Sequence, residues 1–75
     1  MELDHILSCA RRAKRLRGTG PMSTGESLAA AIVLNKPAWL KDMRYTLAEA
    51  INRVDDDGMT APRLLQAQRI IEAEG

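Results

Sequence analysis

The segment STGESLAAAIVLN, residues 23–35, decides how this chain folds. Ser23 and Glu26 have the spacing of a capping box, in which the serine hydroxyl accepts a hydrogen bond from the Glu26 amide and the glutamate carboxylate accepts one from the Ser23 amide. The pair therefore predicts that a helix begins here. The residues Leu28–Leu34 that follow are all apolar. A helix with no polar face is expected at the centre of a fold or in an oligomer interface.

A second capping box, Thr46-x-x-Glu49, predicts the start of another helix over residues 46–54. Between the two boxes, Pro37 suits the first turn of a helix and predicts a short one over residues 37–44. The capping side chains are thereby assigned to structural roles. They are no longer candidates for catalysis.

Apolar residues at three- and four-residue spacing predict a first helix over residues 2–17 and a last helix over residues 60–73. Gly18–Pro21 is expected to end the first helix, and Asn35, which tolerates the left-handed conformation, to end the second. Thr60 is expected to cap the last helix. The expected apolar stripes are Leu3, Ile6, Leu7, Ala10 and Ala13 in the first helix and Ala61, Leu64, Leu65, Gln68 and Ile71 in the last.

Together these patterns predict an all-α fold, a single domain over residues 1–75 that forms a small bundle of about four to five helices, two of them short. The single cysteine excludes an internal disulfide, so a reducing, cytoplasmic setting is expected. The chain has no signal-peptide pattern and no apolar run of the roughly 20 residues that span a membrane, so no membrane partner is expected. A chain of 75 residues buries a small core, which makes a homodimer an open alternative.

The formal charge is only +1, but five of the 11 basic residues fall in one short segment. This basic cluster consists of Arg11, Arg12, Lys14, Arg15 and Arg17. It is a candidate face for an anionic partner such as the phosphates of a nucleic acid. The alternative is a solvated face whose cations complement the C-terminal end of the helix. On the helix, Lys14 and Arg17 flank the apolar stripe, whereas Arg11, Arg12 and Arg15 point to the opposite half.

The two aromatic residues, Trp39 and Tyr45, both belong to the region of the short third helix. Trp39, Leu40 and Met43 are its expected inward residues. They belong either to the core or, with Tyr45, to an interface that anchors a partner protein, because aromatic residues and methionine are enriched at interfaces. The sequence leaves both interpretations open.

The last two helices, residues 46–71, have roughly the lengths of a helix-turn-helix. The candidates for base contacts in this interpretation are Thr60, Arg63, Gln66 and Gln68. The turn between the helices holds Asp55–Asp57, which would repel phosphate. The same turn fails as an EF-hand calcium loop, since Arg53 and Leu64 stand where that pattern needs ligands.

His5 and Cys9 lie four residues apart on one face of the first helix, a spacing that can hold a metal ion. A metal site needs three or four ligands, and the chain has no second histidine or cysteine. The sequence therefore predicts no metal and no cofactor. His5 has no evident partners for a catalytic triad, and Ser23 is explained as a cap. No catalytic residue is predicted, and the chain is not expected to be an enzyme.

Residues 23–54 resemble the compact accessory proteins carried by phages, prophages and plasmids, which implies a small protein of bacterial or mobile-element type. The sequence predicts a non-enzymatic protein-interaction module that binds an unidentified partner protein or a second copy of itself. The alternative is a nucleic-acid-binding regulator. It would use the basic cluster of residues 11–17 and the helix pair of residues 46–71.

Overall fold

The computed structural model describes residues 1–75, which form five α-helices and no strand. The helices are α1 (Leu3–Leu16), α2 (Thr24–Val33), α3 (Pro37–Asp42), α4 (Leu47–Val54) and α5 (Thr60–Ala73). The prediction of a small all-α bundle is confirmed, and the helices begin and end within two residues of the expected ranges. None of them combines the length and the apolar composition needed to cross a bilayer.

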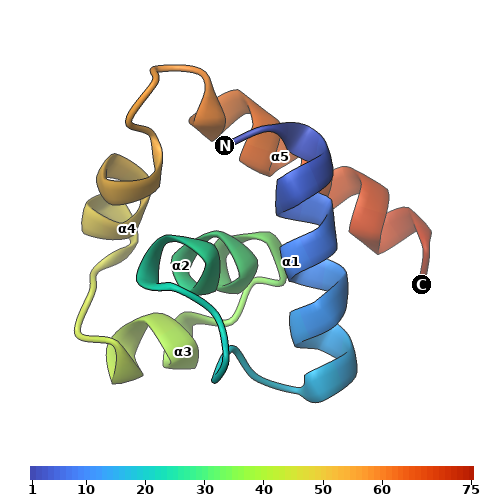
Figure 1. Ribbon diagram of the computed structural model, residues 1–75, viewed down its shortest axis with the longest axis horizontal. Coiled ribbons are helices and arrows are strands. Elements are labelled where there is room, and N and C mark those ends of the chain that lie inside the picture. Colours follow the sequence, from blue (N-terminus) through green and yellow to red (C-terminus); the bar gives the residue numbers. More distant parts are fainter.

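The apolar helix α2 lies in the middle of the molecule and contacts all four other helices (Figure 1). α1 and α5 pack against one side of it, α4 against another, and α3 turns back beneath it. Leu28 and Ala29 are completely buried. Of the two sites expected for a helix without a polar face, α2 therefore occupies the centre of the fold.

The core contains an unusual share of alanine, which allows the helices to approach closely. Buried alanines occur in α1, α2, α4 and α5. They are Ala10, Ala13, Ala29, Ala30, Ala31, Ala50 and Ala67. Larger side chains such as Ile6, Leu28 and Leu64 fill the space between these contacts.

Both capping boxes are formed as the sequence predicts. The Glu26 amide lies 3.3 Å from the Ser23 hydroxyl oxygen, and the Ser23 amide lies 3.1 Å from one Glu26 carboxylate oxygen. The corresponding distances between Thr46 and Glu49 are 3.1 and 3.0 Å. These backbone hydrogen bonds favour the ionised carboxylate and hold the pKa of both glutamates below its usual range.

Three helices end on residues with positive φ, and none of the three is glycine. Arg17, Asn35 and Arg44 have φ of 57°, 54° and 63°. At each end the next amide bonds the carbonyl five residues back, such as the Gly18 amide to the Ala13 carbonyl at 3.1 Å, which is the Schellman pattern. Asn35 was expected to adopt this conformation at the end of α2. At the end of α1, Arg17 adopts it instead of Gly18.

The buried face of α5 differs from the expected stripe. Its buried residues are Thr60, Leu64, Ala67 and Ile71, with spacings of four, three and four residues. Leu65 is instead 50% exposed. The helix is rotated so that Ala67 enters the core, which permits close packing against α1 and α2.

Candidate functional site

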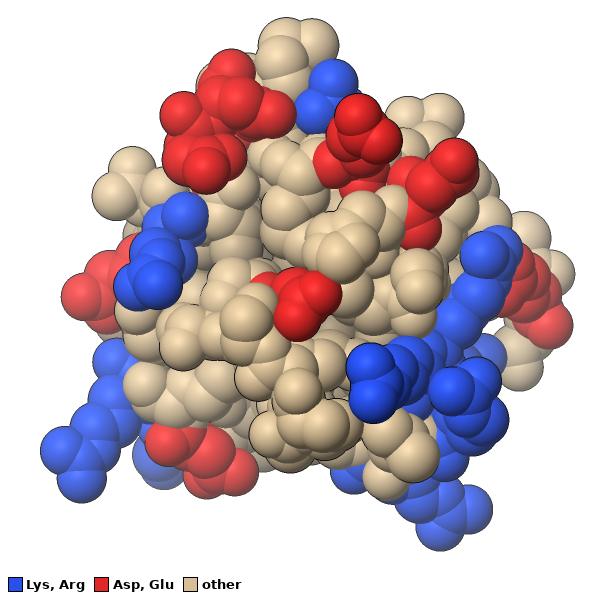
Figure 2. Space-filling model, viewed as in Figure 1, with Lys and Arg blue, Asp and Glu red and all other residues tan.

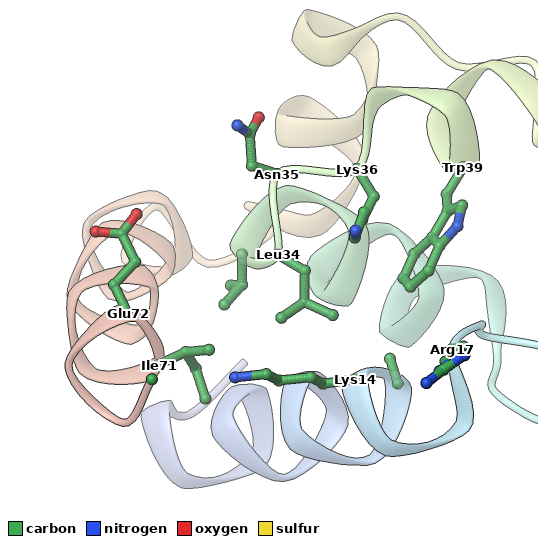
Figure 3. A pocket seen from close by; sticks show the side chains of 11 residues that line it. Lys14, Arg17, Leu34, Asn35, Lys36, Trp39, Ile71 and Glu72 are labelled. Atoms are coloured by element: carbon green, nitrogen blue, oxygen red, sulfur yellow. The ribbon is translucent and has the colours of Figure 1, made fainter.

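A groove of about 560 Å³ opens between the C-terminal half of α1, the α2–α3 junction and the end of α5 (Figure 3). Its floor is apolar and its rim is mainly cationic. The floor is formed by Ala13, Val33, Leu34, Trp39 and Ile71, and the charged rim by Lys14, Arg17, Lys36 and Glu72. We call this feature the α1–α5 groove.

The cations of the groove lie close to its apolar floor. The Lys14 side chain extends along the floor toward Ile71, and Arg17 lies below the indole of Trp39 (Figure 3). The Lys36 ammonium is 6.0 Å from the centre of the Trp39 ring, within the range of a cation–π contact. The groove therefore presents apolar surface and positive charge side by side.

The five residues of the basic cluster occupy different environments in the structure. Lys14 and Arg17, the two residues that flank the apolar stripe of α1, line the groove. Arg11 is paired with Glu74, whose two carboxylate oxygens each lie 3.2 Å from the arginine Nε. This hydrogen bonding raises the pKa of Arg11 and lowers the pKa of Glu74. Arg12 and Arg15 are exposed and make no ion pair.

Charged side chains of one sign gather in two places on the face shown in Figure 2. Cationic side chains gather over the end of α1, and acidic side chains gather over the α4–α5 turn and the start of α1, whereas both signs occur side by side over α3 and α4 (Figure 2). The groove opens within the cationic region, since Lys14 and Arg17 belong to both. Positive potential there would attract an acidic ligand.

The four candidate anchors around α3 occupy different environments. Trp39 is half-buried in the groove, and with Met43 it lines a second hollow of about 200 Å³. Leu40 is a buried core residue. The Tyr45 hydroxyl accepts a hydrogen bond of 3.0 Å from Arg53. The structure therefore places Trp39 and Met43 beside open space and assigns local packing or bonding roles to the other two.

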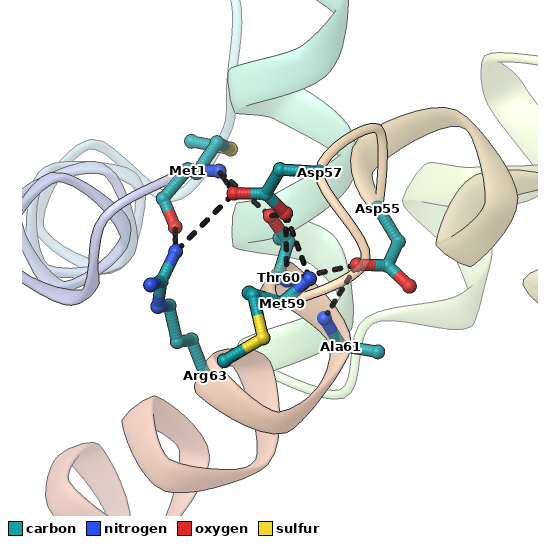
Figure 4. Close-up of polar contacts among 7 residues, drawn as sticks. All are labelled: Met1, Asp55, Asp57, Met59, Thr60, Ala61 and Arg63. Atoms are coloured by element: carbon teal, nitrogen blue, oxygen red, sulfur yellow. Dashed lines mark hydrogen bonds and ion pairs between the residues drawn. The ribbon is translucent and has the colours of Figure 1, made fainter.

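The acidic α4–α5 turn caps α5 (Figure 4). One Asp55 oxygen accepts hydrogen bonds from the amides of Thr60 and Ala61, at 2.8 and 3.2 Å. One Asp57 oxygen accepts from the Met59 amide at 2.9 Å and from the Thr60 amide and hydroxyl at 3.0 and 2.9 Å. The expectation that Thr60 caps the helix with its own side chain was wrong, because the two aspartates provide the cap.

Two of the four candidates for base contacts, Thr60 and Arg63, form hydrogen bonds or ion pairs within this capping region. Thr60 is completely buried, and its hydroxyl accepts a hydrogen bond from the Met1 amino group at 2.6 Å. Arg63 bonds the Met1 carbonyl at 3.1 Å and pairs with Asp57 at 3.3 Å. Of the remaining two, Gln66 is exposed and Gln68 is half-buried.

His5 and Cys9 face each other on α1, away from the groove, and Glu26 of α2 joins them. The Cys9 sulfur lies 3.8 Å from His5 Nε2 and 3.7 Å from Glu26 Oε2. Burial, reinforced by the Glu26 carboxylate, raises the pKa of the Cys9 thiol to about 11. The thiol is therefore protonated at neutral pH, and a protonated thiol is a weak nucleophile.

Comparisons with protein-family models, with curated proteins and with solved structures gave no match. The case for a function therefore rests on the α1–α5 groove and on the charges around it. An apolar floor beside cations can receive apolar side chains that are flanked by carboxylates. The groove residues Leu34, Ile71 and Glu72 could not be found from the sequence, since only the folded chain brings them to α1.

Proposed function

We propose that this chain is a non-enzymatic protein-interaction module whose α1–α5 groove binds an acidic, amphipathic segment of a partner protein. The observation that supports the proposal is the combination of an apolar floor with three cations and one carboxylate on the rim. The volume of about 560 Å³ lies within the range of ligand-binding clefts. It would accommodate a few apolar side chains of a helix or an extended peptide.

In this proposal Trp39 is the central contact. Its indole offers a large, rigid apolar surface, and residues of this type dominate the energetics of many interfaces. Apolar side chains of the partner would pack against Trp39 and Leu34, while its carboxylates would pair with Lys14, Arg17 and Lys36. The rim charges contribute mainly to the association rate and to specificity, so binding is expected to weaken as salt is added.

The experiment is a selection of peptides from a random library on the purified protein, followed by affinity measurements with two double variants. Lys14→Glu/Arg17→Glu reverses the charge inside the groove. Arg12→Glu/Arg15→Glu is the matched control, because it reverses two exposed charges on the same helix that do not line the groove. The two variants have the same net charge, so a difference in their affinities for a peptide reports the position of the reversed charges rather than their number.

We expect the selected peptides to combine apolar residues with Asp and Glu. The groove variant should lose at least about tenfold in affinity, corresponding to about 1.4 kcal/mol, and the control at most a few-fold. An equal loss in both variants would show that binding depends on total charge rather than on the groove. Peptides without acidic residues would also contradict the proposal.

Nucleic-acid binding is a second candidate function. Arg12 and Arg15 are exposed and make no ion pair, and both belong to the C-terminal half of α1. If these cations neutralise phosphates, affinity should fall steeply with salt and should be lost in Arg12→Glu/Arg15→Glu. The absence of binding to duplex or single-stranded DNA or RNA at about 50 mM salt would rule this candidate out.

A further inference from the structure

We infer that His5, Cys9 and Glu26 form a binding site for a divalent transition-metal ion of the zinc class. The site is separate from the α1–α5 groove, because none of the three residues lines it. The sequence places only two of the ligands together, on α1. The fold brings the third, Glu26, from the first turn of α2.

The spacing of the three donor atoms suits a tetrahedral ion. Cys9 Sγ is 3.8 Å from His5 Nε2 and 3.7 Å from Glu26 Oε2, and the two latter atoms are 3.0 Å apart. Zn–S bonds of about 2.3 Å and Zn–N or Zn–O bonds of about 2.0–2.2 Å, at tetrahedral angles, separate ligand atoms by about 3.4–3.6 Å. Small side-chain adjustments would therefore bring all three atoms to bonding distance of one ion.

The types of ligand favour the same class of ion. A thiolate selects against magnesium and calcium, which prefer oxygen, whereas sulfur, imidazole and carboxylate are each ligands that zinc accepts. On binding, the Cys9 thiol would release its proton to solvent, and the charges of the resulting thiolate and of the Glu26 carboxylate would balance that of a divalent cation. Cys9 is 6% exposed, while the side chains of Glu26 and His5 are 31% and 52% exposed. Solvent therefore reaches the fourth position of the ion.

The capping box holds the carboxylate in place for this role. One Glu26 oxygen, Oε1, accepts the hydrogen bond from the Ser23 amide, which leaves Oε2 directed at His5 and Cys9. A hydrogen bond to the carboxylate oxygen that does not bind the ion orients the ligand side chain, and such bonds are important for metal affinity. Because Cys9 is buried where α1 packs on α2, the ion would join the two helices.

The test uses Zn²⁺ alone as the probe on purified full-length chain that has been treated with a chelator. Calorimetric titration should give one ion per chain. With Zn²⁺ about 100-fold above its dissociation constant, the unfolding temperature should rise by roughly 10–20 °C, since the ion binds only the folded chain. Half an ion per chain, or no saturable binding, would overturn the inference.

Substitutions assign the ligands. Cys9→Ser and Glu26→Gln should each weaken Zn²⁺ binding by at least about tenfold, and His5→Gln, at a largely exposed position, should do the same without disturbing the core. Glu49→Gln is the matched control, because it makes the same change in the other capping box and should bind Zn²⁺ as the unmodified chain does. Unchanged affinity in Cys9→Ser would contradict the site.

Cobalt provides a readout of direct ligation. Co²⁺ bound through the Cys9 thiolate should produce a sulfur-to-cobalt charge-transfer band in the near ultraviolet. The band should be absent in Cys9→Ser and present in Glu49→Gln. A cobalt complex that lacks this band in the unmodified chain would show that the thiol is not a ligand.

Discussion

Arg44 ends α3 with φ of 63°, a conformation that costs an L-residue roughly 1–2 kcal/mol and costs glycine nothing. Arg44 is exposed and makes no ion pair. We therefore expect Arg44→Gly to raise the free energy of unfolding by about 0.5–1 kcal/mol, the strain released less the extra entropy of glycine in the unfolded chain. Urea unfolding measures the change.

The matched control for this prediction is Arg12→Gly, in the interior of α1. Arg12 is exposed like Arg44 but has helical geometry, so the same substitution there should lower the free energy of unfolding by about 0.5–1 kcal/mol. Opposite signs at the two sites would confirm that backbone conformation decides the effect. Destabilisation at both sites would contradict this explanation of the α3 terminus.

We expect Asp57 to make the stability of the fold sensitive to acid. Hydrogen bonds from the Met59 amide and the Thr60 hydroxyl, together with the Met1 amino group, hold its pKa far below the usual range. The folded-state pKa lies below the unfolded value of about 3.9, so this stabilisation is present above about pH 4 and is lost as the pH falls below it.

We expect Asp57→Asn to reduce stability at about pH 7 and to make the decline of stability toward about pH 3 less steep. Urea midpoints at the two pH values measure this. Asp56→Asn is the control, because Asp56 takes part in neither the cap nor an ion pair. Equal acid sensitivity in the unmodified chain and in Asp57→Asn would contradict a role for this carboxylate.

Individual capping residues could be predicted from sequence because a capping box depends on a local spacing. Ser23 and Glu26 form the box as expected. The approach of Glu26 to Cys9 and His5 could not be predicted in the same way, because it depends on how α1 packs on α2. A residue with an evident local role can therefore also belong to a site that only the tertiary structure reveals.

At the scale of elements, the small residues of α2 determine how closely its neighbours pack. Ala29 is completely buried in the central helix. We expect Ala29→Leu to lower the free energy of unfolding by about 1–3 kcal/mol, because the added carbons have no space. Ala48→Leu, on the exposed surface of α4, should change it by no more than about 0.5 kcal/mol.

Chemical denaturation of both alanine variants measures this difference. A similar, small effect at the two positions would show that the core around α2 is loosely packed. The same measurement on the unmodified chain supplies the reference midpoint. A large loss confined to Ala29→Leu would support close contact between α2 and its neighbours.

The positions and ends of the helices could be predicted from periodicity and capping residues. The face that each helix buries could be predicted only in part. In α1 the predicted stripe is buried almost as expected, with Ile6, Ala10 and Ala13 in the core. In α5, Leu65 is exposed and Ala67 takes its place. Periodicity alone favours the larger apolar residue, whereas close packing between helices favours the smaller one.

At the scale of the whole molecule, the apolar residues of α2 are covered by the other helices of the same chain. A second copy of the chain is therefore not needed to cover this helix. The groove, in contrast, could not be predicted from the sequence. It joins residues near positions 13–17, 33–39 and 71–75, and the sequence contains no local pattern that links three such distant segments.

The most direct test of the proposed function uses Trp39, the single tryptophan of the chain, as a reporter inside the groove. An acidic, amphipathic peptide obtained by selection is titrated while tryptophan emission is recorded, with a peptide that lacks tryptophan. We expect a saturable shift of emission to shorter wavelength, weakened by salt and abolished in Lys14→Glu/Arg17→Glu but not in Arg12→Glu/Arg15→Glu. Binding that leaves Trp39 emission unchanged would contradict the proposed function.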